Sequence, residues 1–244
     1  MVVTVRHLDA VSAVRYTVPR WSPAWAIPEV PVSESQLHDQ AIEWVRALLL
    51  AWAARSGRRV EVLRNIGIRW FQPEPRAGFD PDLCVLDPAP QVAEGLTSLR
   101  LWEPGLAPPI AALEVVSPSH PYKDYIDTPD RAAACGVGEL WVYDPLLAGP
   151  KVHGGPFALQ LWRRDGESFT RAFAGEGPAY SEAIGAWLHP RVSRIPSEAR
   201  LCFSDSRAGE PPWPTLIEQE RQAAERRAVA AERELAELRA KLPR

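Results

Sequence analysis

Two acidic residues stand inside short apolar segments in the middle of the chain. Asp82 lies in "FDPDLCVLD" and Glu114 in "AALEVVS", and the β-branched surroundings of both predict strands. A carboxylate in such a strand costs several kcal/mol unless a metal, a cation or hydrogen bonds satisfy it. On neighbouring strands the two acids would form a site for a hard divalent cation. Mg²⁺ is the natural candidate, with Mn²⁺ as the alternative.

Phosphodiester hydrolysis is the chemistry that such an ion supports, because it polarises a phosphoryl group and lowers the pKa of an attacking water. The spacing alone also fits a structural interpretation, since Asp-Pro-Asp segments and glutamates at strand ends are common in loops and rims. Both interpretations stay open at this level.

Composition limits the class of protein. At 244 residues, 46% hydrophobic and 24% charged, the chain can form one sizeable globular domain with an appendage. The net charge of −3 gives no global basic field, so binding of nucleic acid requires a local patch. The three cysteines are widely spaced without a CxxC pair, which argues against a disulfide framework and a thiolate zinc site. With no signal-like or membrane-spanning apolar run, we expect a cytoplasmic protein that binds no membrane.

The elements that must position the two acids can be read from periodicity and turn residues. A helix is predicted over 33–57, with Ser33 and Gln36 as a capping box and Gly57 as its end. Extended segments are "RRVEVLRNIGIRWFQ", "PDLCVL", "AALEVVS" and "GELWVYDP", and "DRAAACGV" predicts a helix that ends at Gly136. Asp165 and Gly166 predict a hairpin. Strands with helices before and between them indicate an α/β fold with a mixed central sheet flanked by helices and an added hairpin.

The C-terminal tail differs in composition from the rest of the chain. It is rich in Ala, Glu and Arg, and Thr215 with Glu218 forms a second capping-box pattern. A heptad seam can be drawn through Ile217, Arg221, Ala224, Ala228, Ala231, Leu235, Leu238 and Leu242. Half of these positions are Ala or Arg, so a coiled coil would be weak. A solvated single helix, or one lying on its own domain, remains the alternative.

Several segments together resemble a known family. "DPDLCVLD", "ALEVVSPSHPYKDY" and "PDRAAACGVGELWVYDP" occur in the order and spacing of the Uma-type restriction endonuclease family of the PD-(D/E)XK nuclease superfamily. "VSESQLHDQAIEWVRALL" is similar to the opening helix of that family, and the resemblance runs from about residue 30 to about 190. It implies a restriction-endonuclease-like core and Mg²⁺-dependent hydrolysis of DNA.

The resemblance also implies roles for particular residues. It makes Asp82 and Glu114 metal ligands, with the backbone carbonyl of Val115 as a third. The superfamily places a lysine two residues after the second acid, or in the following helix in the Uma-type pattern. Here those positions are Val116 and Thr128, so neither carries the expected cation.

Three other residues are candidates for the site. Lys123 follows the Ser-Pro-Ser turn and is our first choice for the missing cation, with a solvated loop lysine as the alternative. Arg131 lies about one helical turn beyond Thr128, but arginine stays protonated and is a poor proton acceptor. His38, on the apolar side of the opening helix, is a lower-ranked candidate, because a capping or partly buried role explains it better than catalysis does. The resemblance, which places a histidine near the active face at this position, keeps it among the candidates.

We therefore expect an N-terminal extension (1–29), a nuclease-like domain (30–200), a Pro-rich linker (201–214) and a C-terminal helix (215–244). The leading function is metal-dependent endonuclease action on DNA. The first alternative is a degenerate nuclease fold that binds nucleic acid or protein, and the second is a structural protein assembled by its C-terminal helix. A homodimer through the nuclease domain or through that helix is a further expectation.

Overall fold

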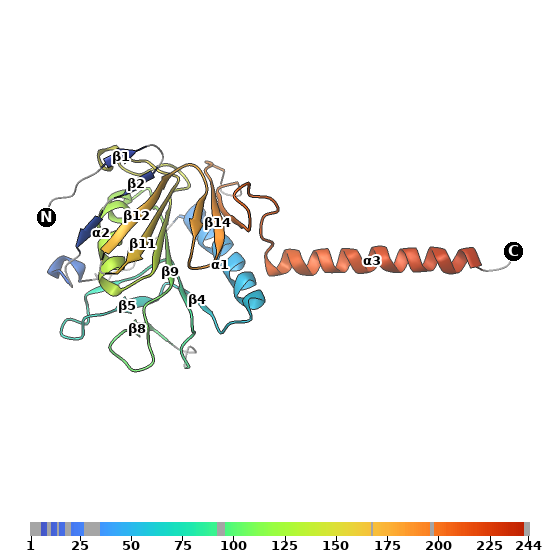
Figure 1. Cartoon of the computed structure of the whole chain (residues 1–244), viewed down its shortest axis with the longest axis horizontal. Coiled ribbons are helices and arrows are strands. Elements are labelled where there is room, and N and C mark those ends of the chain that lie inside the picture. The colour runs from blue at the N-terminus through green and yellow to red at the C-terminus, as the bar shows by residue number, and fades with distance from the viewer. Residues whose placement is uncertain are drawn as a thin grey trace.

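The computed structural model describes residues 6–8, 11–13, 15–17, 21–26, 35–91, 96–166, 168–195 and 198–241. Its helices among these residues are α1 (Gln36–Ser56), α2 (Pro121–Cys135) and α3 (Leu216–Lys241), with short 3-10 turns at η1 (Pro23–Trp25) and η2 (Lys151–His153). Figure 1 shows α1 and α2 against the sheets of the globular part, and α3 extending away from it as a long arm.

A mixed central sheet organises the globular part. Its seven strands in the described residues follow the spatial order β3-β12-β11-β10-β9-β7-β4. Their bounds are β3 Arg15–Thr17, β12 Ser168–Gly175, β11 Leu159–Asp165, β10 Glu139–Tyr143, β9 Ala111–Val115, β7 Leu83–Leu86 and β4 Glu61–Arg64. The pair β9–β10 is parallel and the other neighbours are antiparallel. The predicted mixed α/β fold is confirmed.

Three small sheets complete the strands of the described residues. They are β1-β2, β6-β5-β8 and β13-β14-β15. Their bounds are β1 Arg6–Leu8, β2 Val11–Ala13, β5 Gly67–Arg69, β6 Gly78–Phe79, β8 Ser98–Arg100, β13 Ala179–Ser181, β14 Ala186–Arg191 and β15 Arg200–Ser204. The last strand crosses the expected boundary at residue 200, and the division of the chain into segments stays a prediction.

The central strand β9 is buried on both faces, and its side chains alternate between two hydrophobic cores. Leu113 and Val115 pack in the core that contains the apolar side of α1, whereas Ala112 packs in the core that contains α2. Because side chains alternate along a strand, Glu114 belongs to the α2 side. The helix α2 is the crossover between the parallel strands β9 and β10, which is why it covers the sheet beside Glu114.

The two helices beside the sheet begin at positions other than those predicted. The cap of α1 is Ser35, whose hydroxyl accepts from the backbone N–H of His38, whereas Ser33 lies outside the described residues. Helix α2 begins at Pro121 and contains Pro129, so it starts about two and a half turns before the predicted segment. Proline is favourable at the first helical position, where no N–H is needed. The predicted ends at Gly57 and Gly136 are confirmed, and both glycines have positive φ.

The predicted hairpin is confirmed and lies within the central sheet. Strands β11 and β12 pair antiparallel from Leu159–Gly175 to Asp165–Ser168, and Gly166 occupies the turn with φ of 59°. The predicted capping box of the tail is also confirmed. The hydroxyl of Thr215 accepts from the N–H of Glu218, and a carboxylate oxygen of Glu218 accepts from the N–H of Thr215 at 2.8 Å.

Candidate active site

The two acids of the apolar segments meet across a pair of antiparallel strands. In the β7–β9 ladder Leu83 lies opposite Leu113, so the next residues outward on the two strands are Asp82 and Glu114. Both side chains are buried, with 6% of Asp82 and 2% of Glu114 exposed. The pairing of a strand start with a strand end thus brings together two carboxylates that are far apart in the sequence.

Backbone groups of β9 hold the first acid in place. The N–H of Val115 donates to Oδ2 of Asp82 at 2.7 Å, and this bond links the carboxylate directly to the residue after Glu114. A hydrogen bond to the charged form favours the carboxylate and compensates part of its burial. The carboxylate of Asp82 is therefore held in place beside the C-terminal end of β9.

His38 reaches the same strand from the opposite face of the sheet. The cap at Ser35 starts α1 so that His38 lies in its first turn, buried and with Nε2 2.8 Å from the carbonyl oxygen of Val115. A carbonyl only accepts, so Nε2 carries the proton in this contact. The same nitrogen is 3.4 Å from Oδ2 of Asp82. His38 therefore orients the carbonyl of Val115 and adds positive potential beside Asp82.

Lys123 is the cation that lies nearest the acids among the described contacts. It sits in the first turn of α2, with Nζ 3.8 Å from Oε2 of Glu114 and 4.0 Å from Oδ1 of Asp124. The negative charge of Glu114 raises the pKa of Lys123 above its ordinary value, against the opposing effect of burial. The side chain is 52% exposed, so its charged head reaches both the buried acids and solvent.

Asp124 is a third acid at this site that the sequence interpretation missed. It is 2% exposed, and burial raises its pKa from 3.8 to about 7, although the charge of Lys123 opposes the shift. The hydroxyl of Thr128, one turn along α2, donates to Oδ1 at 3.5 Å. The signal that could have revealed it is Pro121, because a helix starting there points residue 124 inward beside residue 128.

The remaining candidates lie around this group. Arg131 is on α2, and its Nη1 donates to the carbonyl oxygens of Gly78 at 3.0 Å and Trp25 at 3.3 Å. Its guanidinium thus ties α2 to β6 and η1, and burial lowers its pKa. The two positions where a lysine was expected, Val116 and Thr128, are buried in the protein.

The chemistry of the donors fits a hard divalent cation. Asp82 and Glu114 provide carboxylate oxygens, and the carbonyl of Val115 has a second lone pair beside the bond to His38. Magnesium commonly takes one or two carboxylates and completes its shell with water and phosphate. Within the described residues no group of three or more His, Cys, Asp and Glu side chains could hold a metal ion, so the set is two acids and a carbonyl.

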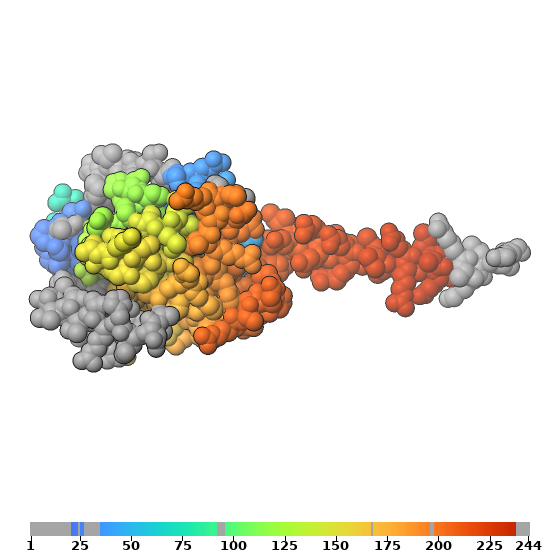
Figure 2. Space-filling view, turned by 90° about the horizontal axis from the view of Figure 1, so that it is seen from above, coloured from blue at the N-terminus to red at the C-terminus, as the bar shows by residue number. Residues whose placement is uncertain are grey.

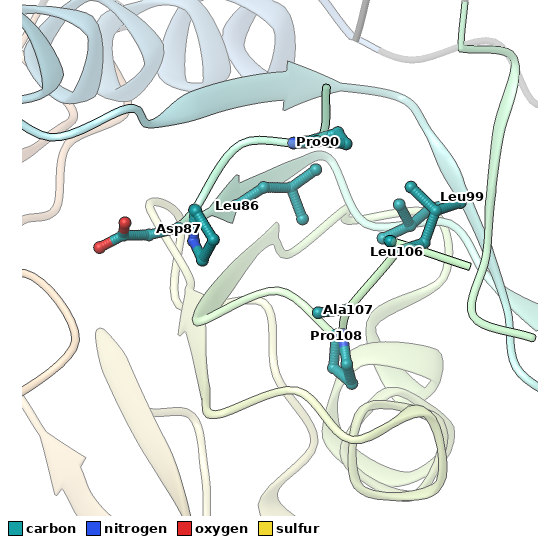
Figure 3. A pocket seen from close by; sticks show the side chains of 9 residues that line it. Leu86, Asp87, Pro90, Leu99, Leu106, Ala107 and Pro108 are labelled. Atoms are coloured by element: carbon teal, nitrogen blue, oxygen red, sulfur yellow. The ribbon is translucent and has the colours of Figure 1, made fainter. Parts of the chain in front are cut away.

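A small cavity elsewhere in the protein is too small to be an alternative active site. It lies between the turn after β7 and the segment before β9, and its volume of about 10 Å³ holds about one water. Figure 3 shows the leucines that line it, with the carboxylate of Asp87 directed away from them. Asp87 is paired with Arg58, Nη1 to Oδ2 at 2.8 Å, which explains this acid by structure alone.

Comparison with known families gives these residues a context. Residues 27–154 match the sequence model of the Uma2 family, described as "Putative restriction endonuclease". The chain belongs to this family. The match contains α1, β7, β9 and α2, and hence each of the candidate residues. Restriction-endonuclease-like families generally use divalent metals, and their substrates are nucleic acids.

Other comparisons add little about this chain. A crystal structure described as a putative nuclease belonging to DUF820 from Anabaena variabilis is similar, with a TM-score of 0.40 and 12% identity. The similarity covers 63% of this chain and 76% of that one. No curated protein matches the sequence. None of the helices in the described part of the chain combines the length and the apolarity needed to cross a membrane.

Proposed function

We propose that this Uma2 family member is a metal-dependent endonuclease that hydrolyses phosphodiester bonds in DNA. The observation that supports the proposal most directly is the facing pair of buried acids, Asp82 and Glu114, with a cation 3.8 Å from the second. Two buried carboxylates on neighbouring strands are costly without a compensating charge, and Lys123 is half exposed. A bound divalent ion would supply that charge and would account for the burial of both acids.

In this proposal Asp82, Glu114 and the carbonyl of Val115 hold Mg²⁺, with Mn²⁺ as the alternative. When bound, the ion polarises a phosphoryl oxygen and lowers the pKa of a water. His38 keeps the carbonyl of Val115 in position through its bond at 2.8 Å. Residues of the chain thus orient the ligand set from both faces of the sheet.

Lys123 takes the role of the missing lysine. Because Glu114 raises its pKa, the ammonium stays protonated at neutral pH and stabilises negative charge on the phosphate instead of accepting a proton. Asp124 carries a pKa of about 7 next to it and is the group able to accept or return a proton at neutral pH. Arg131 is the second candidate for the cationic role, although its guanidinium donates to the backbone carbonyls of Trp25 and Gly78.

The experiment is a calorimetric titration of Mg²⁺ and Mn²⁺, with plasmid nicking followed in the same samples. It compares the wild type with Glu114→Gln, which removes one ligand charge at constant size, and with Asp80→Asn. Asp80 is only two residues from Asp82 but is paired with Arg69 at 2.6 Å, so it provides the matched control.

We expect heat of metal binding and plasmid nicking in the wild type and in Asp80→Asn, and neither of them in Glu114→Gln. Absence of metal heat from all three proteins would mean that Glu114 is a structural acid, and the proposal would be wrong. For the lysine, Lys123→Gln should lose nicking and keep metal binding, while Lys123→Arg should keep part of the activity because the charge remains.

A degenerate nuclease fold that only binds nucleic acid or a protein is the second candidate. It is favoured by Val116 and Thr128, which occupy the two expected lysine positions and are both buried. This candidate predicts metal binding without nicking in the wild type. It also predicts that Lys123→Gln changes DNA affinity alone, measured with a labelled duplex.

A further inference from the structure

We propose that α3 is a dimerisation helix that pairs, parallel and in register, with α3 of a second copy of this chain. The helix is 26 residues long and extends away from the globular part in Figure 1, and beyond its base no described element covers it in the view of Figure 2. Its side chains from Glu220 to Glu237 are exposed, apart from the half-buried Ala223. The inference is independent of the proposed nuclease function.

The base of the helix is fixed to the globular core, so its direction is set by the fold. Trp213 is buried against Phe203, with ring centroids 5.7 Å apart, and the guanidinium of Arg55 lies 3.9 Å from the ring of Trp213. The capping box at Thr215 then starts the helix at once. The helix therefore leaves the globular part instead of lying along its surface (Figure 1).

An isolated helix of this kind is only marginally stable in water, even with good helix formers. Two pairs along the surface support it, Arg221–Glu225 at 3.7 Å and Arg233–Glu237 at 3.3 Å, but such exposed pairs contribute little. Apolar side chains also remain in water, with Ile217 78% and Leu235 48% exposed. A partner helix would stabilise the helical conformation and would bury these apolar side chains.

The surface that would contact the partner helix is the part of the heptad pattern whose side chains the structure describes, called the stripe below. It consists of Ile217, Arg221, Ala224, Ala228, Ala231 and Leu235. Alanines at these positions allow two helices to approach closely, and Ile217 and Leu235 provide larger contacts at the two ends. The guanidinium of Arg221 is drawn off the stripe by Glu225, so its charge need not be buried in the seam. The pairing is therefore specific but weak.

Charges beside the stripe select a second copy in parallel orientation. In a parallel pair, Arg227 of one helix faces Glu232 of the other, and symmetry makes this attractive contact twice. The like pair of Glu220 with Glu225 is offset by Arg221, which already contacts Glu225. In an antiparallel pair the flanking positions face their own kind.

On one side of the stripe, the positions directly after Ile217, Ala224 and Ala231 are all glutamates: Glu218, Glu225 and Glu232. An antiparallel pair would place them opposite one another, and like charges in that position are destabilising. The parallel form also puts both globular parts at the same end of the dimer. If the proposed function holds, two hydrolytic sites would then act near each other on the two strands of a duplex.

The test measures the mass of the full chain by sedimentation over a range of protein concentrations, in the presence of chelator. We expect a monomer–dimer equilibrium in the wild type and a loss of at least about tenfold in dimer affinity for Leu235→Glu. Val229→Glu is the matched control, because Val229 is 65% exposed on the same helix but lies off the stripe. Neither residue is in a core, and circular dichroism checks the helix content.

Orientation is tested by a charge exchange and by a cross-link. Arg227→Glu and Glu232→Arg should each weaken the dimer, and the double variant should restore it. Ala231 lies on the stripe and faces Ala231 of the second copy in a parallel pair, so Ala231→Cys should form an intermolecular disulfide. The three native cysteines are buried and should not compete with it. A wild-type monomer at every concentration would overturn the proposal, as would a dimer that survives Leu235→Glu. Failure of both the exchange and the cross-link would overturn the parallel orientation, and none of these outcomes depends on nuclease activity.

Discussion

Replacing Asp124 by asparagine should change how the stability of the protein depends on pH. The carboxyl is 2% exposed, and burial raises its pKa from 3.8 to about 7, an effect that the charge of Asp82 reinforces and the charge of Lys123 opposes. In the unfolded chain the same group titrates near its ordinary value. Between the two pKa values the folded protein therefore binds a proton that the unfolded chain does not.

The sign and the size follow from proton linkage. A raised folded pKa gives stability that is fully present below pH 3.8 and is lost as the pH rises to about 7. One proton corresponds to a slope of about 1.4 kcal/mol per pH unit in that window. The asparagine variant has no group to titrate at this position. The difference in unfolding free energy between wild type and variant should fall with that slope.

The assay is urea unfolding at a series of pH values from acid to neutral, in chelator so that no metal neutralises the acids. Asp124→Ser serves as the control, since it packs differently from asparagine but equally lacks a titrating group. Both variants should give the same slope relative to the wild type, whatever their absolute stability. Parallel curves for wild type and variants would refute the inference that Asp124 is buried and protonated near neutral pH.

Three further predictions concern stability. Ser35→Ala should lower the unfolding free energy by about 1 kcal/mol, because the cap of α1 is lost, and an unchanged urea midpoint would contradict it. Glu139→Leu should cost roughly 3 kcal/mol in thermal unfolding, since the buried carboxylate accepts from Ser181 and Arg163, and a variant as stable as the wild type would exclude this role. Thr215→Ala should reduce helicity by circular dichroism through loss of the box at the start of α3, and an unaltered spectrum would count against it.

Much of the fold could be predicted because hydrophobic periodicity and turn residues determine local structure within a few residues of the chain. The helix over α1, the run of β9 and the hairpin at Gly166 each have their cause within a few neighbouring residues. The facing of Asp82 and Glu114 required one more step, the pairing of their strands, which apolar runs on both faces favour.

Hydrophobic periodicity did not predict the start of α2. "SPSHPYKDYIDTP" contains three prolines and resembles a loop, yet Pro121 occupies the first helical position and Pro129 lies inside the helix. Tertiary packing outweighs the hydrogen bond that Pro129 cannot donate, because Tyr125 and Ala132 on the same helix are buried against the sheet. The early start turns a loop lysine into a helical one and buries Asp124. Sequence periodicity could not reveal either change.

The position of that helix start explains how the site can do without a lysine at either expected position. A lysine at Val116 or Thr128 would approach the acids from inside the protein, because both positions are buried and Val116 packs in the core beside α2. Lys123 approaches instead from the N-terminal turn of α2, and its side chain remains 52% exposed. On this path the ammonium is partly exposed to solvent and lies within 4.0 Å of oxygens of two buried acids, Glu114 and Asp124. The relocation of the charge and the burial of Asp124 are therefore one structural change, and a variant that alters either residue should affect the other.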